Sequence, residues 1–345
     1  MTGEQPGEFD LIARLVEAVE EAKRGAPRAS GSGDALARVL IGSGDDAAVT
    51  APPGVTATSV DAFVEGVHFR RDTASLESIG RKAMGAALSD LAAMGAAPGE
   101  AYVQLGVPSD LDEAGGVELA TGLGRAAAEA GIALIGGDVT RAPALLLALT
   151  VVGHAGAPGN LVSRGGATTG EVVAVTGELG GAAAGLLLLE RPELGRGLDG
   201  GVADALRRRQ LDPSPRIAAG RTLAASGATA MIDLSDGLGG DAGHVARASE
   251  VRLVIELENV PAQAGVEEVA VAAGLDPWEV VTAGGEDYEL LVTLPRDRLS
   301  EARSAVGDAG TTLTPIGDVA QGDGVSLRQT DGSEREASGF DQLRR

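Results

Sequence analysis

Aspartates in short Gly- or Ser-rich segments are the residues of this chain best suited to chemistry. They occur in Gly44-Asp45-Asp46, Ser59-Val60-Asp61, Ser89-Asp90, Gly136-Gly137-Asp138, Asp233-Leu234-Ser235-Asp236 and, with a glutamate, Gly285-Glu286-Asp287. Carboxylates are costly to bury unless a cation lies between them. Oxygen ligands in this number suit Mg²⁺, which in proteins usually accompanies substrate phosphates. The pattern predicts a magnesium- and nucleotide-dependent enzyme whose site is assembled from many parts of the chain.

The composition narrows the classes of partner. The net charge of -22 argues against binding to nucleic acid or to an anionic membrane, and no apolar run is long enough to span a bilayer. The absence of cysteine excludes a thiol nucleophile and a cysteine-ligated zinc site. Only Lys23 and Lys82 are lysines, and such an acidic, lysine-poor composition is typical of a salt-accumulating halophile. An ordinarily acidic protein from a high-GC genome is the alternative.

The length of 345 residues predicts two domains. The first half alternates helices (8–24, 75–94, 111–130) with strands (39–41, 56–60, 101–107, 133–135, 144–153), and two of these strands are expected to end at Asp61 and Gly-Gly-Asp138. The pattern restarts after Ala155-Gly156-Ala157-Pro158, so we place the boundary near residues 155–165. The fold class expected is α/β, with strands and helices mixed in both halves.

Each acidic motif also has an ordinary structural explanation. Asp45 and Asp46 could form a plain turn, because Gly and Asp are the commonest turn residues. Asp90 lies within a predicted apolar helix, where Asp is unfavourable because its side chain competes for backbone hydrogen bonds, so a ligand role is favoured there. Asp233 and Asp236 follow an apolar strand; Ser235 or Asp236 could cap the next helix, or the two acids could bind metal while Ser235 contacts phosphate.

Two further motifs remain open on their residues alone. Glycines before Asp138 would allow a phosphate to approach the backbone, although neither a Walker A loop nor a Rossmann fingerprint is present. His68 could be structural, as lone histidines usually are. Arg164 in a Gly-rich turn could be a solvated surface residue or a bidentate phosphate ligand.

The ordered set of motifs resembles the thiamine-monophosphate kinase family, within the superfamily of aminoimidazole-ribonucleotide synthetase-like ATP-dependent enzymes. The matching segments run in family order over nearly the whole chain: Gly7 to Ile12, Gly44 to Ala48, Ser59 to Asp61, Val64 to Phe69, Leu88 to Gly95, Gly136 to Asp138, Arg164-Gly165, Asp212 to Arg216, Ile232 to Leu238 and Gly284 to Leu290. Any one segment is weak evidence, whereas the ordered set is highly specific.

The resemblance implies a fold, an activity and a site. It implies a two-domain fold with residues 1–158 as an ATP- and Mg-binding dimerisation domain, whose strands form a dimeric barrel, and residues 159–345 as a C-terminal α/β domain. It implies that ATP phosphorylates thiamine phosphate in a cytoplasmic homodimer. The implied magnesium ligands are Asp46, Ser59, Asp61, Asp90, Asp138, Asp233 and Asp236. The implied ATP contacts are Gly137, Asp138, Arg164 and Ser235, and the implied thiamine phosphate contacts are His68, Glu286 and Phe340.

Two positions depart from the family pattern: Val60 and Val139 stand where threonine is usual. No strong general base is needed, because a phosphomonoester is mostly a dianion near neutral pH. Direct in-line transfer assisted by magnesium is therefore expected. The alternatives are another ATP-dependent enzyme of the same superfamily and a non-enzymatic, acidic metal-binding protein.

Overall fold

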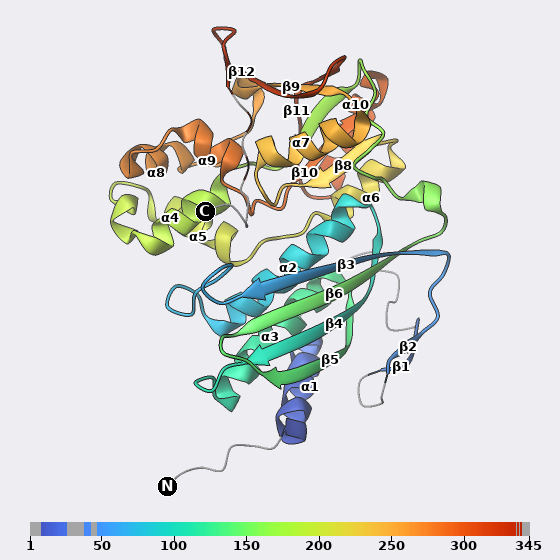
Figure 1. The fold of residues 1–345 in the computed structure, drawn as a ribbon, viewed down its shortest axis with the longest axis vertical. Coiled ribbons are helices and arrows are strands. Elements are labelled where there is room, and N and C mark those ends of the chain that lie inside the picture. Colours follow the sequence, from blue (N-terminus) through green and yellow to red (C-terminus); the bar gives the residue numbers. More distant parts are fainter. Residues whose placement is uncertain (1–7, 26–37, 43–46, 336, 338, 340–345) are drawn as a thin grey trace. The chain divides into compact units, whose positions relative to one another are not determined.

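The computed structural model describes residues 8–25, 38–42, 47–335, 337 and 339, and its contacts divide the chain into two compact units (Figure 1). Unit 1 comprises Met1–Leu91 and Ala97–Gly156. Unit 2 comprises Ala92–Ala96 and Ala157–Arg345. The described part of the chain contains no helix long and apolar enough to cross a membrane.

Unit 1 is built on a four-stranded sheet with the strand order β3-β6-β4-β5. Its elements are α1 (Glu8–Gly25), β1 (Val39–Ile41), β2 (Val49–Thr50), β3 (Val55–Val64), α2 (Leu76–Ala93), β4 (Ala97–Val107), α3 (Glu113–Ala130), β5 (Ala133–Arg141) and β6 (Leu146–Ala155). Strands β4 and β5 are parallel, joined through α3, and β6 is antiparallel to both of its neighbours. Strands β1 and β2 form a separate small hairpin-like pair.

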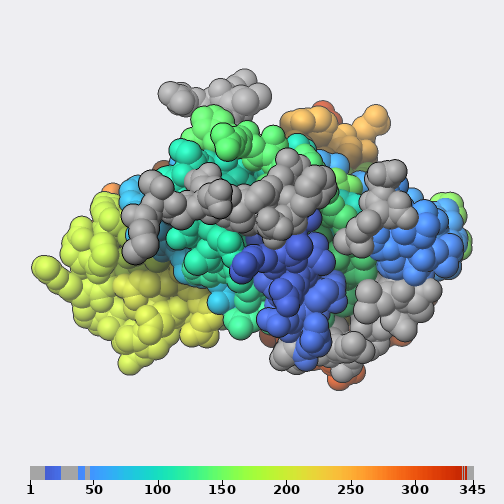
Figure 2. Space-filling model, turned by 90° about the horizontal axis from the view of Figure 1, so that it is seen from below, coloured from blue at the N-terminus to red at the C-terminus, as the bar shows by residue number. Residues whose placement is uncertain are grey.

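Helices cover one face of this sheet. The backbones of α2 and α3 approach closely, because a Cβ at Gly122 would lie 2.0 Å from the carbonyl oxygen of Glu77. Helix α1 packs beside α3 and buries Leu15, Ala18, Val19 and Ala22, which recur at helical spacing. Its opposite side lies at the surface, where Figure 2 shows α1 in dark blue.

The other face of the same sheet is open within unit 1. Along β3 the side chains alternate between covered and exposed positions, and Val60 on the open face is 67% exposed. Strands β3 and β5 are the two edges, so the described strands of this chain form an open sheet and no closed barrel.

Unit 2 holds a seven-stranded sheet with the order β13-β12-β9-β11-β7-β10-β8. Its strands are β7 (Val172–Thr176), β8 (Ala230–Asp233), β9 (Arg252–Glu256), β10 (Leu290–Leu294), β11 (Leu313–Ala320), β12 (Gly324–Arg328) and β13 (Glu334–Arg335). All named pairs are antiparallel except β12 with β9. Strands β7, β8 and β10 are buried throughout.

The buried strands alternate their side chains between two apolar cores. Val173 and Val175 join a core with helices α4, α5, α7, α8 and α9, whereas Ala174 joins a core with α6 and α10. The helices are α4 (Gly181–Glu190), α5 (Gly200–Leu211), α6 (Ile217–Ala225), α7 (Leu238–Ser249), α8 (Val266–Ala273), α9 (Pro277–Ala283) and α10 (Leu299–Asp308). Unit 2 is therefore a sheet between two helical layers, and the chain is of the mixed α/β class that the sequence predicts.

The strand ends were less predictable than the strands themselves. Asp61 and Asp138 were expected at strand ends, but β3 and β5 continue past them to Val64 and Arg141. Pairing with β6 and β4 extends these strands beyond the apolar residues that mark them in the sequence. Helix α9 was not expected, because it has only seven residues and therefore little periodicity.

Candidate functional site

Three predicted ligands of unit 1 meet where β3 faces helix α2. Ser59 and Asp61 stand two residues apart on β3, so both side chains lie on the helix-covered face. Asp90 lies in the last turns of α2, and one of its carboxylate oxygens accepts a short hydrogen bond from the Ser59 hydroxyl. The structure thus brings two carboxyl groups and a hydroxyl to one place.

The electrostatics of this group favour a cation. Burial and then the charge of Asp90 raise the pKa of the Asp61 carboxyl to about 6. The raised pKa means that a second negative charge is poorly tolerated here without compensation. A bound cation would reverse that effect and keep both carboxylates ionised.

Asp138 lies elsewhere on the same sheet. The cross-strand register aligns Asp138 with Gln104, then Ala148, then Ala62, and residues directly opposite one another share a face. Ala62 follows Asp61 in the chain and so lies on the opposite, open face. Three strand spacings also separate β5 from β3, which amounts to about 14 Å. Within one chain, the structure therefore does not bring Asp138 to Asp61 and Asp90.

Gly137 is placed for close packing against β4. A Cβ at this position would lie 2.2 Å from the carbonyl oxygen of Val103, so no larger residue fits without a backbone shift. Gly137 and Asp138 are both exposed on the edge strand β5. An edge strand leaves backbone groups available to a ligand or to another strand.

His68 is held in the turn that follows β3. Its Nδ1 accepts a hydrogen bond of 3.1 Å from the Val64 backbone N–H, and its ring meets Phe63 edge to face. Lys82 on α2 donates to the His68 carbonyl oxygen at 3.3 Å. Lys82 was not among the predicted site residues, although lysine is rare in this chain and Lys82 is buried.

In unit 2 the predicted aspartates lie between the end of β8 and the start of α7. Asp233 is the last residue of β8 and is 5% exposed. The backbone N–H groups of Ser235 and Asp236 both donate to Oδ2 of Asp241, each at 3.0 Å. Asp241, in the first turn of α7, fixes the shape of this loop and was missed in the sequence, where it looks like an ordinary N-terminal helix acid.

Asp241 also shows how strongly negative this loop is. Burial raises the pKa of its carboxyl to about 8, together with the charges of Asp233 and Asp236 and against the two backbone hydrogen bonds. Burial and neighbouring acids together thus make this carboxyl harder to ionise, as they do for Asp61 in unit 1.

Glu286 lies beside the same loop. Its backbone N–H donates to the Ser235 carbonyl oxygen at 2.8 Å, and the N–H of Tyr288 donates to that of Leu234 at 2.8 Å. Both Glu286 and Tyr288 adopt left-handed backbone conformations, with φ of 58° and 49°. Such conformations are strained for residues other than glycine and persist where surrounding contacts enforce them. The Glu286 carboxylate accepts a hydrogen bond of 2.7 Å from Nε2 of Gln210.

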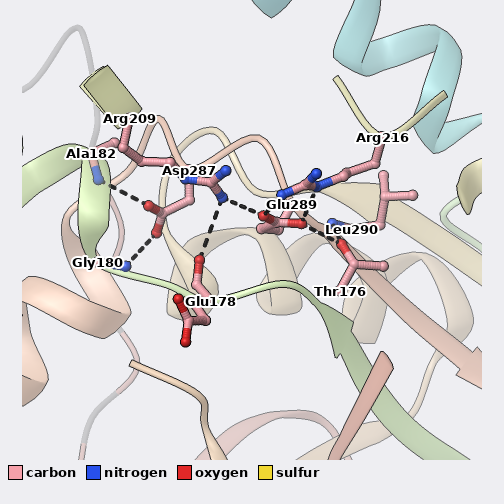
Figure 3. Close-up of polar contacts among 9 residues, drawn as sticks. All are labelled: Thr176, Glu178, Gly180, Ala182, Arg209, Arg216, Asp287, Glu289 and Leu290. Atoms are coloured by element: carbon pink, nitrogen blue, oxygen red, sulfur yellow. Dashed lines mark hydrogen bonds and ion pairs between the residues drawn. The ribbon is translucent and has the colours of Figure 1, made fainter. Parts of the chain in front are cut away.

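The acids that follow Glu286 have structural partners (Figure 3). Glu289 is fully buried and accepts hydrogen bonds from Arg209, Arg216 and the Thr176 hydroxyl. Asp287 accepts from the backbone N–H groups of Gly180 at 2.7 Å and Ala182 at 3.2 Å. Asp287 therefore occupies the N-terminus of α4, which would otherwise attract an anion.

Arg164 lies beside β8 in unit 2, because the carbonyl oxygen of the preceding residue, Ser163, accepts at 3.0 Å from the backbone N–H of Met231, two residues before Asp233. The Arg164 carbonyl oxygen accepts from the hydroxyl of Ser249, the last residue of α7. The side chain of Arg164 is exposed. Asp46 and Phe340 lie outside the described residues.

The described residues offer the oxygen donors that magnesium prefers, but they do not form a complete binding site. Among the described residues, no group of three or more acidic or histidine side chains is arranged to hold a metal ion. The carboxylates of Asp61 and Asp90, with the Ser59 hydroxyl, supply only oxygen donors, and Mg²⁺ commonly binds through one or two carboxylates while keeping several waters. The donor set and the raised pKa of Asp61 therefore fit Mg²⁺.

Comparison with known proteins places the chain in a family. Residues 44–155 match the N-terminal domain model of AIR synthase related proteins, and residues 168–329 match the C-terminal domain model. A thiamine-monophosphate kinase from Mycobacterium tuberculosis is 38% identical over 296 residues, which cover 84% of this chain and 81% of that protein.

Comparison with solved structures leads to the same family. The crystal structure of thiamine-monophosphate kinase from Stenotrophomonas maltophilia K279a is 32% identical, covers 94% of this chain and 97% of that one, and has a TM-score of 0.80. AaThiL, solved in complex with AMPPCP and TMP, is 31% identical, covers 83% of this chain and 86% of its own, and has a TM-score of 0.72. By sequence and by fold, the chain belongs to the thiamine-monophosphate kinase family of AIR synthase related proteins.

Proposed function

We propose that this chain transfers the γ-phosphoryl group of ATP to thiamine phosphate, which gives ADP and thiamine diphosphate. The observation that carries the proposal is the convergence of Ser59, Asp61 and Asp90 in a chain whose relatives are thiamine-monophosphate kinases. A related structure was solved with the ATP analogue AMPPCP and with TMP, which supports this pair of substrates.

Magnesium would be held by two groups of oxygen donors. Asp61, Asp90 and Ser59 form the group in unit 1, and Asp233 and Asp236 form the group in unit 2; Asp46 and Asp138 are further candidate ligands. When bound, Mg²⁺ neutralises phosphate charge and so reduces repulsion between the two anionic substrates. The packing of Asp61 against Asp90 supports this assignment, because it leaves negative charge in need of a cation.

The residues of the chain would align the two substrates and would take no covalent part in the reaction. An acceptor phosphate that is already a dianion needs no base to remove a proton, so alignment of donor and acceptor is the main task. Ser235 would contact the ATP phosphates through its hydroxyl, because its backbone N–H is already bonded to Asp241. Gly137 and Arg164 would contact ATP, and His68, Glu286 and Phe340 would contact thiamine phosphate.

The functional assembly would be a homodimer. Asp138 lies on the open face and edge of the unit 1 sheet, apart from Asp61 and Asp90 of its own chain. Pairing of two such sheets into a barrel would cover this face and allow Asp138 to serve a site that includes another copy. Light scattering in a series of KCl concentrations tests the assembly, and a dimer is expected at high salt. Circular dichroism in the same series should show loss of structure at low salt, because a net charge of -22 makes the chain repel itself. A monomer at every salt concentration would contradict it.

The proposed reaction is tested by product analysis. Purified protein with ATP, Mg²⁺ and thiamine phosphate in high KCl should release ADP and form thiamine diphosphate in equal amounts, as measured by chromatography. Unphosphorylated thiamine and an unrelated phosphomonoester serve as matched acceptors and should give little product. ADP release that does not depend on thiamine phosphate would instead favour another ATP-dependent reaction of the superfamily.

A further inference from the structure

Gln210 is a buried polar residue that no predicted role accounts for. It lies near the end of α5, is 5% exposed, and directs its Nε2 to the Glu286 carboxylate at 2.7 Å. Its Oε1 is buried and has no hydrogen-bond partner among the described residues. Leaving a buried amide oxygen unpaired has a cost, which argues that the bond to Glu286 selects this side-chain position.

The position of Gln210 is fixed from several sides. Helix α4 approaches α5 so closely that a Cβ at Gly185 would lie 2.1 Å from the Leu206 carbonyl oxygen and 3.1 Å from Cβ of Gln210. The preceding residue, Arg209, forms an ion pair with the buried Glu289 (Figure 3). The backbone and Cβ of Gln210 are therefore held beside α4, which fixes the point from which its amide reaches Glu286.

The other end of this contact is fixed as well. The turn that carries Glu286 is bound to Leu234 and Ser235 through two backbone hydrogen bonds. Three residues after Glu286, the carboxylate of Glu289 accepts two hydrogen bonds from Arg216. Both residues of the Gln210–Glu286 pair thus stand on anchored backbone, while the Glu286 side chain is only partly buried. A carboxylate held in this way can present its charge to a ligand with little loss of side-chain entropy on binding.

We propose that Gln210 is a positioning residue for thiamine phosphate, which it serves by holding the Glu286 carboxylate toward the cationic ring of the acceptor. The inference rests on the proposed function, and in particular on the contact between Glu286 and the acceptor. A neutral amide suits the task, because it orients the carboxylate without neutralising it. Glu289 shows the contrast, since two arginines compensate its charge.

The test is a double-mutant cycle on Gln210 and Glu286. Gln210→Met keeps the volume but removes the donor, Glu286→Ala removes the carboxylate, and Arg208→Ala, at an exposed position of the same helix, is the control. Gln210→Met should raise the KM and the Kd for thiamine phosphate about tenfold while leaving the KM for ATP near its wild-type value. In the Glu286→Ala background the same change should alter them less than about twofold, because the residue through which Gln210 acts is gone.

The outcomes separate this inference from the proposed function. Equal effects of Gln210→Met on both substrates, an unchanged KM for thiamine phosphate, or an undiminished effect in the Glu286→Ala background would overturn the positioning role alone. A wild-type chain that neither turns over nor binds thiamine phosphate, as measured by calorimetry, would overturn both. Melting temperatures of all variants show whether an effect reflects misfolding, and if Gln210→Met misfolds, Gln210→Leu replaces it in the same cycle.

Discussion

Glu289 in unit 2 and Asp61 in unit 1 are both acids shielded from solvent at least in part, but their surroundings shift their pKa values in opposite directions. Burial alone would raise the pKa of Glu289, yet hydrogen bonding from Arg216 and the charges of Arg209 and Arg216 hold it below its usual value. Asp61 is less deeply buried, and its pKa is nevertheless raised to about 6 by burial and by the neighbouring Asp90.

On the proposed function, the difference separates an acid that stabilises the fold from an acid that binds a cation. An acid that holds the fold together is supplied with its own cations, as Glu289 is by two arginines. An acid that faces another acid costs stability in the free chain, and such costs concentrate where a ligand later compensates them. For Glu289 and Asp61, the presence or absence of a neighbouring arginine therefore distinguishes the two acids better than their depth of burial does.

The largest effect is expected from the acids of unit 1. Asp90→Asn should lower turnover about a hundredfold or more, because it removes a proposed magnesium ligand while keeping the shape of the side chain. The melting temperature of the metal-free protein should stay level or rise, since repulsion with Asp61 is lost. The exposed Asp72 provides the matched control, Asp72→Asn, and near-normal activity of Asp90→Asn at saturating Mg²⁺ would contradict the functional assignment.

The next effect concerns the structural acid. Arg216→Met should lower the free energy of unfolding by about 3 kcal/mol, because Glu289 would keep its buried charge with only Arg209 to compensate it. Urea denaturation followed by circular dichroism measures this. Combining the change with Glu289→Gln should recover part of the loss, and a double variant no more stable than the single one would argue against charge compensation as the cause.

A smaller effect should appear in the pH dependence of the metal-free protein. The folded-state pKa values of Asp61 and Asp241 are raised to about 6 and about 8, so their stabilising contributions are complete below the ordinary value of 3.8. Those contributions are lost as the pH rises through about 6 for Asp61 and about 8 for Asp241. The melting temperature should therefore fall as the pH rises from about 3.8 to about 8. Mg²⁺ should reduce this dependence on pH, and an identical slope with and without Mg²⁺ would be the adverse result.

The smallest effect is expected at an exposed ion pair. Arg296 and Asp318 interact at 2.5 Å, but both side chains are more than half exposed. Arg296→Ala should change the free energy of unfolding by less than about 1 kcal/mol, because water and salt screen such pairs. A loss as large as that of Arg216→Met in the same denaturation experiment would show that burial is not what distinguishes the two arginines.

The sequence was sufficient for the fold class and for most helices. Apolar periodicity is a local signal, and it identified α2 correctly. The proximity of Ser59, Asp61 and Asp90 agrees with the ligand set that the family resemblance implies, and their role as ligands stays a prediction. Cross-strand register is not local, so the separation of Asp138 from Asp61 could not be read from the chain. The roles of Asp241 and Gln210 were likewise hidden, because each depends on a partner brought near only by the turn or the packing of unit 2.

The left-handed backbone at Glu286 has a consequence for how this protein can be improved. Glycine would relieve the strain at φ 58° and remove the carboxylate in a single step. In directed evolution for heat tolerance, Glu286→Gly would set this relief of strain against the loss of the partner of the buried Gln210 amide, and on the proposed function it would weaken discrimination of the acceptor. A library intended to yield a robust catalyst should hold this codon constant, or select for survival and turnover together.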